Sequence, residues 1–349
     1  MSEKIMYRED KTVSKVYKET YLRGIEQVIS DREQNARMKR DCYSADIFQN
    51  QEKFRKDLRD MLGWPLTENN VCTIPTVRLE KLTDESRYSI FRMTLEVIDG
   101  LEITGLLFRK NESKMPLVVV QHGGYGTPEL ISNFYGNTSN YNDMLERVLL
   151  QDVHVFAPQL LLWKGEDHQV EHDRVNLDAR LKRVGSSITA LEVYAIIRIN
   201  DYFSAQDYVT NLGMVGFSYG GLYTLFTTAL DARIKSAVSC SFFNTRSEIA
   251  WSDWTWFCSA EQFCDAEIAC LVYPRRLCIE VGARDEFFAI DGARAEMQRL
   301  RNKCREVGTD WLDYIEYDGL HEFCQDDFAI KRLVEDLNYN LTHCERAVR

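Results

Sequence analysis

The sequence has little proline, no apolar run long enough to cross a bilayer, and fewer basic than acidic residues. With 6 Pro and 18 Gly in 349 residues, the composition excludes collagen-like and low-complexity chains. The 43 basic and 54 acidic residues give a net charge of −11, and a negative surface repels nucleic-acid phosphates and anionic lipids. We therefore expect neither a nucleic-acid partner nor a membrane partner.

The first residues lack the apolar stretch of a secretory signal, because they run directly into charged side chains. We therefore predict a cytoplasmic protein. The ten cysteines lack the close pairs that a zinc site requires, since Cys258, Cys264 and Cys270 are evenly spaced. Cys240 and Cys278 lie within apolar runs, which favours buried free thiols in a reducing compartment.

Residues 1–75 have the charge content and the apolar spacing of helices. Two stretches repeat apolar side chains at helical spacing: Tyr17, Tyr21, Ile25 and Val28, then Phe54, Leu58, Met61 and Leu62. Gly63 and Pro65 mark the end of the second helix. We predict an N-terminal helical extension whose apolar faces cover either the main domain or a second subunit, so a homodimer stays open.

Residues 76–349 carry the pattern of an α/β domain. Apolar and polar residues alternate over 91–97 and again over 101–107, with a turn between them, which predicts an antiparallel hairpin. Short continuous apolar runs then alternate with helical stretches, as strands buried on both faces do: 117–120, 153–157, 214–215, 237–240, 277–281 and 314–317. We predict a mostly parallel central sheet with flanking helices and an antiparallel N-terminal hairpin.

A G-x-S-x-G motif follows the run at 214–215 and precedes an apolar helical pattern. A sharp turn between a strand and a helix brings its flanking residues so close together that a Cβ atom would not fit at positions 216 and 220. Glycine, which has no Cβ atom, occupies both positions. Such a turn exposes the hydroxyl of Ser218 at the end of the sheet, above the positive end of the helix. We predict that Ser218 is a nucleophile and that the Tyr219 N–H stabilises an oxyanion.

A serine nucleophile requires a base, and the base requires an acid that orients it. His321 lies in a loop just past the last predicted strand, and Asp285 lies immediately after the strand before it. We predict that His321 is the base and Asp285 the acid, with Glu286 as the fallback. Asp291 is interpreted as a helix N-cap.

The second oxyanion donor is expected in the Gly-rich segment 121–126, which follows the first parallel strand. Small residues there allow backbone N–H groups to approach a substrate oxygen. We predict Gly124 as the donor and keep Tyr125 as the competitor. His122 is interpreted as a residue that braces this loop.

These motifs resemble the α/β-hydrolase superfamily, and within it the dienelactone hydrolase and acetyl xylan esterase branch. The similarity covers residues 85–345 and depends on 122–124, 216–221, Gly282 with Asp285, and 319–321, in the chain order serine, aspartate, histidine. It implies the α/β-hydrolase fold, an acyl-enzyme intermediate, and neither metal nor organic cofactor. Dienelactone hydrolases use a cysteine nucleophile, so Ser218 favours ordinary esters.

We therefore expect a serine hydrolase that cleaves a small-molecule carboxylic ester. A small serine peptidase of the prolyl-oligopeptidase type is one alternative, although the N-terminal block is too short to form a propeller. A ligand-binding protein with weak turnover is the other, although a pure binding protein does not need all three groups.

Two further features leave alternatives open. An insert at about 242–270 is rich in aromatic residues and forms either a cap over the site or part of the core: Phe242, Phe243, Trp251, Trp254, Trp256, Phe257 and Phe263. The segment from His168 to His172 reads H-x-x-E-H, an inverted zincin motif. Because this motif needs a helix and lies here in a polar, acidic stretch, we interpret it as a solvated loop.

Overall fold

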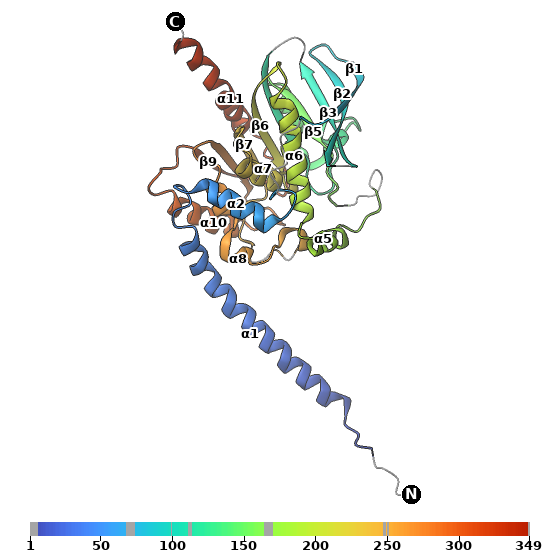
Figure 1. Cartoon of the computed structure of the whole chain (residues 1–349), viewed down its shortest axis with the longest axis vertical. Helices are drawn as coiled ribbons and strands as arrows, with labels where there is room; N and C mark the ends of the chain where they lie inside the picture. Colours follow the sequence, from blue (N-terminus) through green and yellow to red (C-terminus); the bar gives the residue numbers. More distant parts are fainter. Residues whose placement is uncertain are drawn as a thin grey trace.

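A computed structural model describes the chain at residues 6–67, 74–98, 100–110, 114–163, 170–246, 249 and 251–347, with side chains up to residue 339. Within these ranges a nine-stranded sheet forms the centre of the molecule (Figure 1). The strands lie in the order β1-β2-β3-β5-β4-β6-β7-β8-β9. None of the described helices is both long and apolar enough to cross a membrane.

The first part of the sheet is antiparallel and the rest is parallel. Antiparallel pairing joins β1 to β2, β2 to β3 and β3 to β5, whereas β5, β4, β6, β7, β8 and β9 are parallel to one another. The strands have these bounds: β1 (Val77–Asp84), β2 (Tyr88–Ile98), β3 (Leu101–Lys110), β4 (Met115–Gln121), β5 (His154–Pro158), β6 (Val209–Phe217), β7 (Ile234–Cys240), β8 (Arg276–Gly282) and β9 (Leu312–Tyr317). The predicted sheet and hairpin are therefore confirmed.

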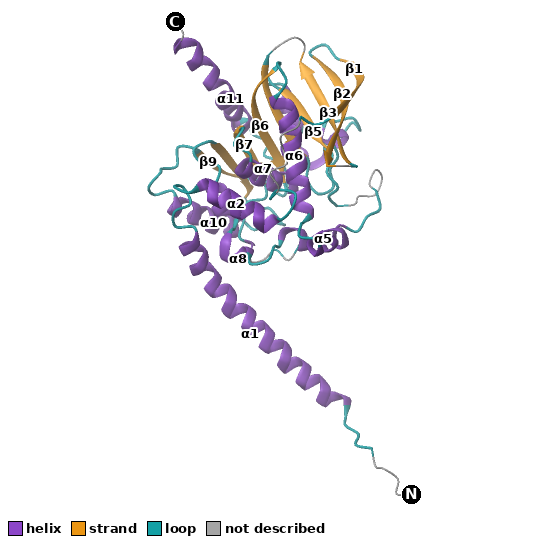
Figure 2. Ribbon diagram, viewed as in Figure 1, coloured by secondary structure: helices purple, strands orange, loops and turns teal. Residues whose placement is uncertain are grey.

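Helices cover both faces of the sheet (Figure 2). Alternate residues of β4 point to opposite sides, because Leu117 and Val119 lie in one apolar core while Val118 and Val120 lie in the other. The first core contains residues of α2 (Gln51–Leu62), α6 (Ile188–Ser204), α7 (Tyr219–Leu230), α9 (Asp265–Cys270) and α10 (Ile290–Lys303). The second contains residues of α3 (Pro128–Ile131), α4 (Met144–Leu149) and α11 (Phe328–Ala347). Burial on both faces explains the continuous apolar runs in the sequence.

The N-terminal residues form two helices that differ in environment. In α2, Phe54 and Leu58 are fully buried in the same core as α6 and α7. By contrast, α1 (Lys11–Tyr43) projects along most of its length away from the rest of the described chain, which we call the body (Figure 1). Only Ala36 and Arg40 of α1 are buried, close to α8 (Ser259–Gln262). The division of the chain at residue 75 stays a prediction.

Candidate active site

Ser218 occupies the turn between β6 and α7 in a backbone conformation that few side chains adopt. Its φ is 58° and its ψ is −121°, and a non-glycine residue with positive φ is strained unless its surroundings hold it there. The flanks of the turn are tightly packed: a Cβ at Gly216 would collide with the carbonyl of Gly220, and a Cβ at Gly220 with the carbonyl of Gln121. The glycines therefore permit the close approach that presents the Ser218 hydroxyl.

The structure brings together the side chains of Ser218, His321 and Asp285. His321 Nε2 lies 2.9 Å from Ser218 Oγ, and His321 Nδ1 lies 2.8 Å from Asp285 Oδ2. The three residues follow β6, β9 and β8, whose carboxyl ends meet at one edge of the parallel part of the sheet. With its proton on Nδ1, His321 donates to the carboxylate and can accept the serine proton at Nε2.

Backbone donors fix the orientation of the Asp285 carboxylate. Its Oδ1 accepts hydrogen bonds from the N–H groups of Phe287 at 2.8 Å and Phe288 at 2.9 Å, which leaves Oδ2 for His321. Glu286, the fallback acid, instead accepts a hydrogen bond from the backbone N–H of His321 at 3.1 Å. Glu286 therefore holds the loop that carries His321.

The N-cap interpretation of Asp291 is wrong. Helix α10 begins at Ile290 with Ala289 as its N-cap. Asp291 lies within the first turn, where its exposed carboxylate is 3.5 Å from the Arg294 guanidinium. An acidic side chain in that turn still interacts favourably with the positive end of the helix.

Trp163 connects the two segments that were predicted to supply oxyanion donors. Its backbone N–H donates to the carbonyl of Gly124 at 2.8 Å, and its indole N–H donates to the Tyr219 hydroxyl at 3.0 Å. A Cβ at Gly124 would approach the Trp163 ring to 2.9 Å. Gly124 and Tyr125 both line the pocket beside Ser218, so the choice of donor stays a prediction.

A buried network of charged side chains contacts the hydroxyl of Tyr219. The Tyr219 hydroxyl donates to Asp253 Oδ2 at 2.9 Å, and Arg174 Nε donates to the same oxygen at 2.7 Å. Arg174 also pairs with Glu192 at 2.8 Å. Burial raises the pKa of Tyr219, so its hydroxyl stays protonated and keeps donating. Sequence reasoning missed this network, and an aspartate within an aromatic insert was the only signal that could have found it.

His122 lies within the Gly-rich segment 121–126 and is fully buried. Its Nδ1 is 2.9 Å from the carbonyl of Gly123, and its Nε2 accepts a hydrogen bond from the N–H of Leu160 at 3.1 Å. Burial lowers the pKa of His122 to about 4, so the ring is neutral at physiological pH. These contacts describe a histidine that braces the loop.

A cavity of about 510 Å³ opens onto Ser218 and His321. Seven of its lining residues are aromatic: Tyr125, Tyr141, Trp163, Phe217, Trp251, Phe287 and Phe288. The aromatic insert contributes Trp251 to this wall, whereas Phe257 is exposed and the other members are buried in the core: Phe242, Phe243, Trp254, Trp256 and Phe263. The interpretation of the insert as part of the core therefore holds for these five residues, and a cap over the site stays a prediction.

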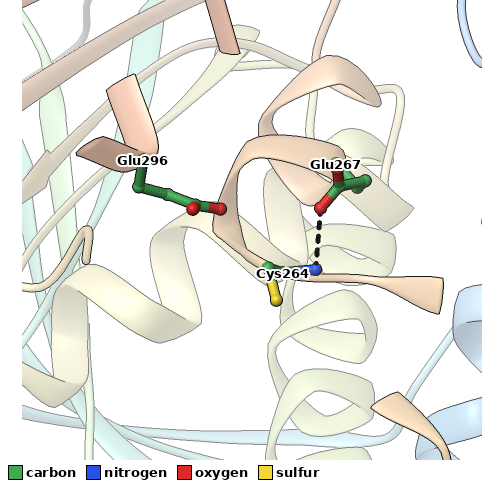
Figure 3. A group of neighbouring side chains, drawn as sticks. All are labelled: Cys264, Glu267 and Glu296. Carbon is green, nitrogen blue, oxygen red and sulfur yellow. Dashed lines mark hydrogen bonds between the residues drawn. The ribbon is translucent and has the colours of Figure 1, made fainter. Parts of the chain in front are cut away.

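Cys264, Glu267 and Glu296 place a thiol and two carboxylates close enough to bind a metal ion (Figure 3). Cationic side chains already surround them: Arg299 lies 2.6 Å from Glu267 and 3.1 Å from Glu296, and Lys303 lies 3.2 Å from Glu267. A second positive ion would be repelled there. We therefore interpret this cluster as a structural ion-pair network.

The H-x-x-E-H segment lies partly outside the described residues, because His168 is not among them. His172 is half-buried and contacts backbone carbonyls, with Nε2 2.8 Å from Leu162 O and Nδ1 2.7 Å from Val170 O. Described residues 170–173 are not helical. The helical arrangement that an inverted zincin needs is therefore absent from the described part of the motif.

No family model and no curated protein matches this sequence. Solved esterase structures share its fold at low sequence identity. A Bacteroides fragilis protein assigned as an acetyl xylan esterase is 12% identical, with a TM-score of 0.64 over 87% of this chain and 89% of that one. The glucuronoyl esterase from Solibacter usitatus is 12% identical, with a TM-score of 0.60 over 82% and 92%. An acetyl xylan esterase from Thermoanaerobacterium is 15% identical, with a TM-score of 0.53 over 82% and 94%.

These similarities and the strand order confirm the predicted α/β-hydrolase fold. Identities this low define the fold alone, and a single fold carries many activities. The function must therefore be argued from the side chains at the carboxyl edge of the sheet.

Proposed function

We propose that this protein is a serine hydrolase that cleaves carboxylic esters through an acyl-enzyme intermediate. One observation carries the proposal: the hydrogen-bonded series Ser218, His321 and Asp285 lies beside an open cavity. Ser218 is the nucleophile, His321 the general base and acid, and Asp285 the residue that orients the imidazole. The esterase names of the structural neighbours agree with this assignment.

In the proposed mechanism, Ser218 Oγ attacks the ester carbonyl while His321 Nε2 takes its proton. The oxyanion of the tetrahedral intermediate accepts hydrogen bonds from the N–H groups of Gly124 and Tyr219. The alcohol then leaves with the proton from His321. A water molecule attacks the acyl-enzyme with His321 again as base, and the carboxylic acid departs as Ser218 regains its proton.

The pocket supports a preference for neutral esters. Its described lining includes the carboxylates of Glu286 and Glu322 and neither lysine nor arginine. An acyl group with its own carboxylate would meet like charges there, which opposes binding. The aromatic wall provides apolar area for an alkyl or aryl group instead.

We also propose a cytoplasmic location and a mechanism without metal or organic cofactor. Eight cysteines in the described residues are free, which suits a reducing compartment. The general base and the oxyanion donors of the proposed mechanism belong to the protein itself. Activity should therefore persist in the presence of a chelator, and loss of turnover with EDTA that added zinc restores would contradict this part of the proposal.

The proposal is tested with p-nitrophenyl esters of increasing acyl length, together with one ester whose acyl chain ends in a carboxylate. We expect turnover that depends on Ser218, with a kcat/KM at least about tenfold higher for the neutral ester than for the carboxylate ester of matched length. Hydrolysis no faster than that of the Ser218→Ala variant for every ester would contradict the proposal. It would favour a ligand-binding protein with the hydrolase fold.

A further inference from the structure

Helix α1 is anchored at its C-terminal end and unsupported over the rest of its length. Arg40 contacts the body through Glu267, with Nε 3.3 Å from the carboxylate, and Ala36 is buried beside it. Residues 11–33 instead run outward from the body (Figure 1), and the side chains along this segment are almost all exposed. This outer segment of α1 therefore has a surface that the described body does not cover.

The outer segment carries an apolar face in solvent. Seven large apolar side chains, 41% to 74% exposed, recur along it: Val16, Tyr17, Tyr21, Leu22, Ile25, Val28 and Ile29. Most of them lie on one broad side of the helix, since they repeat at steps of three or four. Aromatic and β-branched residues and the interior Gly24 are weak helix formers, and an isolated helix gains most of its stability from packing such a face. The segment needs a partner.

The charges of the outer segment change sign along its length. Lys11, Lys15 and Lys18 carry three positive charges over residues 11–18, which contain no acidic residue. Over residues 26–33, Glu26, Asp31 and Glu33 outnumber the single Arg32, giving a net charge of −2. A copy of the same segment that runs in the opposite direction is therefore complementary in charge, whereas a copy that runs in the same direction is not.

We propose that the outer segments of two copies of this chain pair antiparallel about a point near residue 22, forming a two-fold dimer. The apolar faces then cover each other, and the lysines of each helix lie alongside the acidic end of the other. The arrangement is self-complementary and closed, as two-fold contacts are.

The placement of the body agrees with the antiparallel direction. Each body lies at the C-terminal end of its α1 (Figure 1), so antiparallel pairing puts the two bodies at opposite ends of the helix pair. Parallel pairing would bring both bodies to one end and set lysine against lysine. Residues 11–33 contain five basic and four acidic side chains, which is not the basic excess that holds an amphipathic helix on anionic lipid.

Sedimentation velocity on the full-length protein tests the dimer. Ile25 lies within the apolar face, whereas Ser30 is exposed on the opposite side of the helix, so Ile25→Glu and Ser30→Glu form a matched pair. We expect the wild type and Ser30→Glu to be dimers. Ile25→Glu should raise the dimer dissociation constant at least about 100-fold, because it buries two unpaired carboxylates. A monomeric wild type, or equal dimerisation of both variants, would overturn the proposal.

Spin labels test the direction of the pair. In a background with Cys42→Ser and Cys258→Ser, which replaces the two exposed described cysteines, one label is placed at Arg23→Cys and, separately, one at Glu33→Cys. At 1.5 Å per residue, antiparallel pairing about residue 22 separates the two Glu33 labels by about 33 Å along the axis and keeps the Arg23 labels adjacent. Short distances at both positions would indicate parallel helices and overturn the proposal.

A lipid surface is the alternative partner for the apolar face. The wild-type protein is mixed with vesicles of phosphatidylcholine and phosphatidylserine and sedimented. We expect the protein to stay in the supernatant as a dimer. Monomers that bind the vesicles, with binding lost in Ile25→Glu and retained in Ser30→Glu, would assign the face to a membrane and overturn the dimer.

Discussion

Two of the buried clusters of titratable side chains in the described residues differ in what can reach them. In the cluster of Cys264, Glu267 and Glu296, the side chains of Arg299 and Lys303 already pair with the carboxylates that a metal ion would need. In the cluster of Ser218, His321 and Asp285, the carboxylate is fully engaged, but the hydroxyl and the imidazole face a cavity. Burial of carboxylates therefore does not define a functional site, whereas access to a reactive atom does.

The two clusters also differ in backbone conformation, at Cys264 and at Ser218. Cys264 has an ordinary extended conformation, with φ −116° and ψ −173°, and its backbone N–H donates to Glu267 in a capping interaction at the start of α9. Ser218 has a positive φ. Strain of this kind persists where the surrounding structure imposes it, and such positions concentrate at functional sites. We therefore expect the cluster around Cys264 to contribute to stability and the cluster around Ser218 to contribute to turnover.

The largest expected effect is that of Ser218→Ala. Loss of the nucleophile should lower kcat by about 10⁶-fold, while the free energy of unfolding changes by less than about 1 kcal/mol, because only a hydroxyl is removed. Steady-state kinetics and urea denaturation measure the two quantities. Residual turnover within tenfold of the wild type would show that another residue attacks the ester.

Asp285→Asn should have the next largest effect. An amide cannot hold the imidazole in the tautomer that leaves Nε2 free to accept the serine proton, so kcat should fall by about 10⁴-fold. Glu286→Gln is the matched control, since its carboxylate contacts the backbone of His321 rather than the ring, and it should cost far less. If Asp285→Asn and Glu286→Gln exchange these effects, the acid is Glu286.

Glu267→Gln should affect stability and leave turnover unchanged. Glu267 is fully buried and accepts ion pairs from Arg40, Arg299 and Lys303. Removing its charge takes a buried carboxylate partner from each of these three cations, at a cost of about 3–5 kcal/mol. Denaturation midpoints and kcat of the folded fraction measure the two effects. A large loss of kcat in the folded protein would contradict the separation of the two clusters.

Glu280 is a buried carboxylate that belongs to neither cluster. Burial raises its pKa from 4.5 to about 7. The folded state therefore retains a proton that the unfolded state releases, and the stability contributed by this group falls as the pH rises from about 4.5 through about 7. Glu280→Gln removes this titration. The free energy of unfolding of Glu280→Gln, relative to that of the wild type, should increase by about 2–3 kcal/mol from pH 5 to pH 8. A difference independent of pH would contradict the raised pKa.

Much of the fold can be predicted because its signals are local. Each parallel strand is buried on both faces and therefore appears as an apolar run. Strand β1 was missed, since it lies at the edge of the sheet and its residues are exposed apart from the half-buried Val77. An exposed edge strand has no apolar pattern to detect.

The candidate site was predictable for a related reason. Ser218, Asp285 and His321 each follow a strand, and the carboxyl ends of neighbouring parallel strands meet at one edge of the sheet. The support of Tyr219 was not predictable, because Arg174 and Asp253 are 79 residues apart in the chain and meet only in the folded protein. The aspartate within the aromatic insert marks one member of the network, but the local sequence does not show that Arg174 contacts it.

The most direct test of the proposed site is reaction of the protein with a fluorophosphonate, followed by peptide mapping by mass spectrometry. Only a serine activated by a neighbouring base reacts readily with this reagent. We expect one phosphonyl adduct on Ser218, lost in Ser218→Ala and formed much more slowly in His321→Ala. An unlabelled wild-type protein, or an adduct on a different residue, would contradict it.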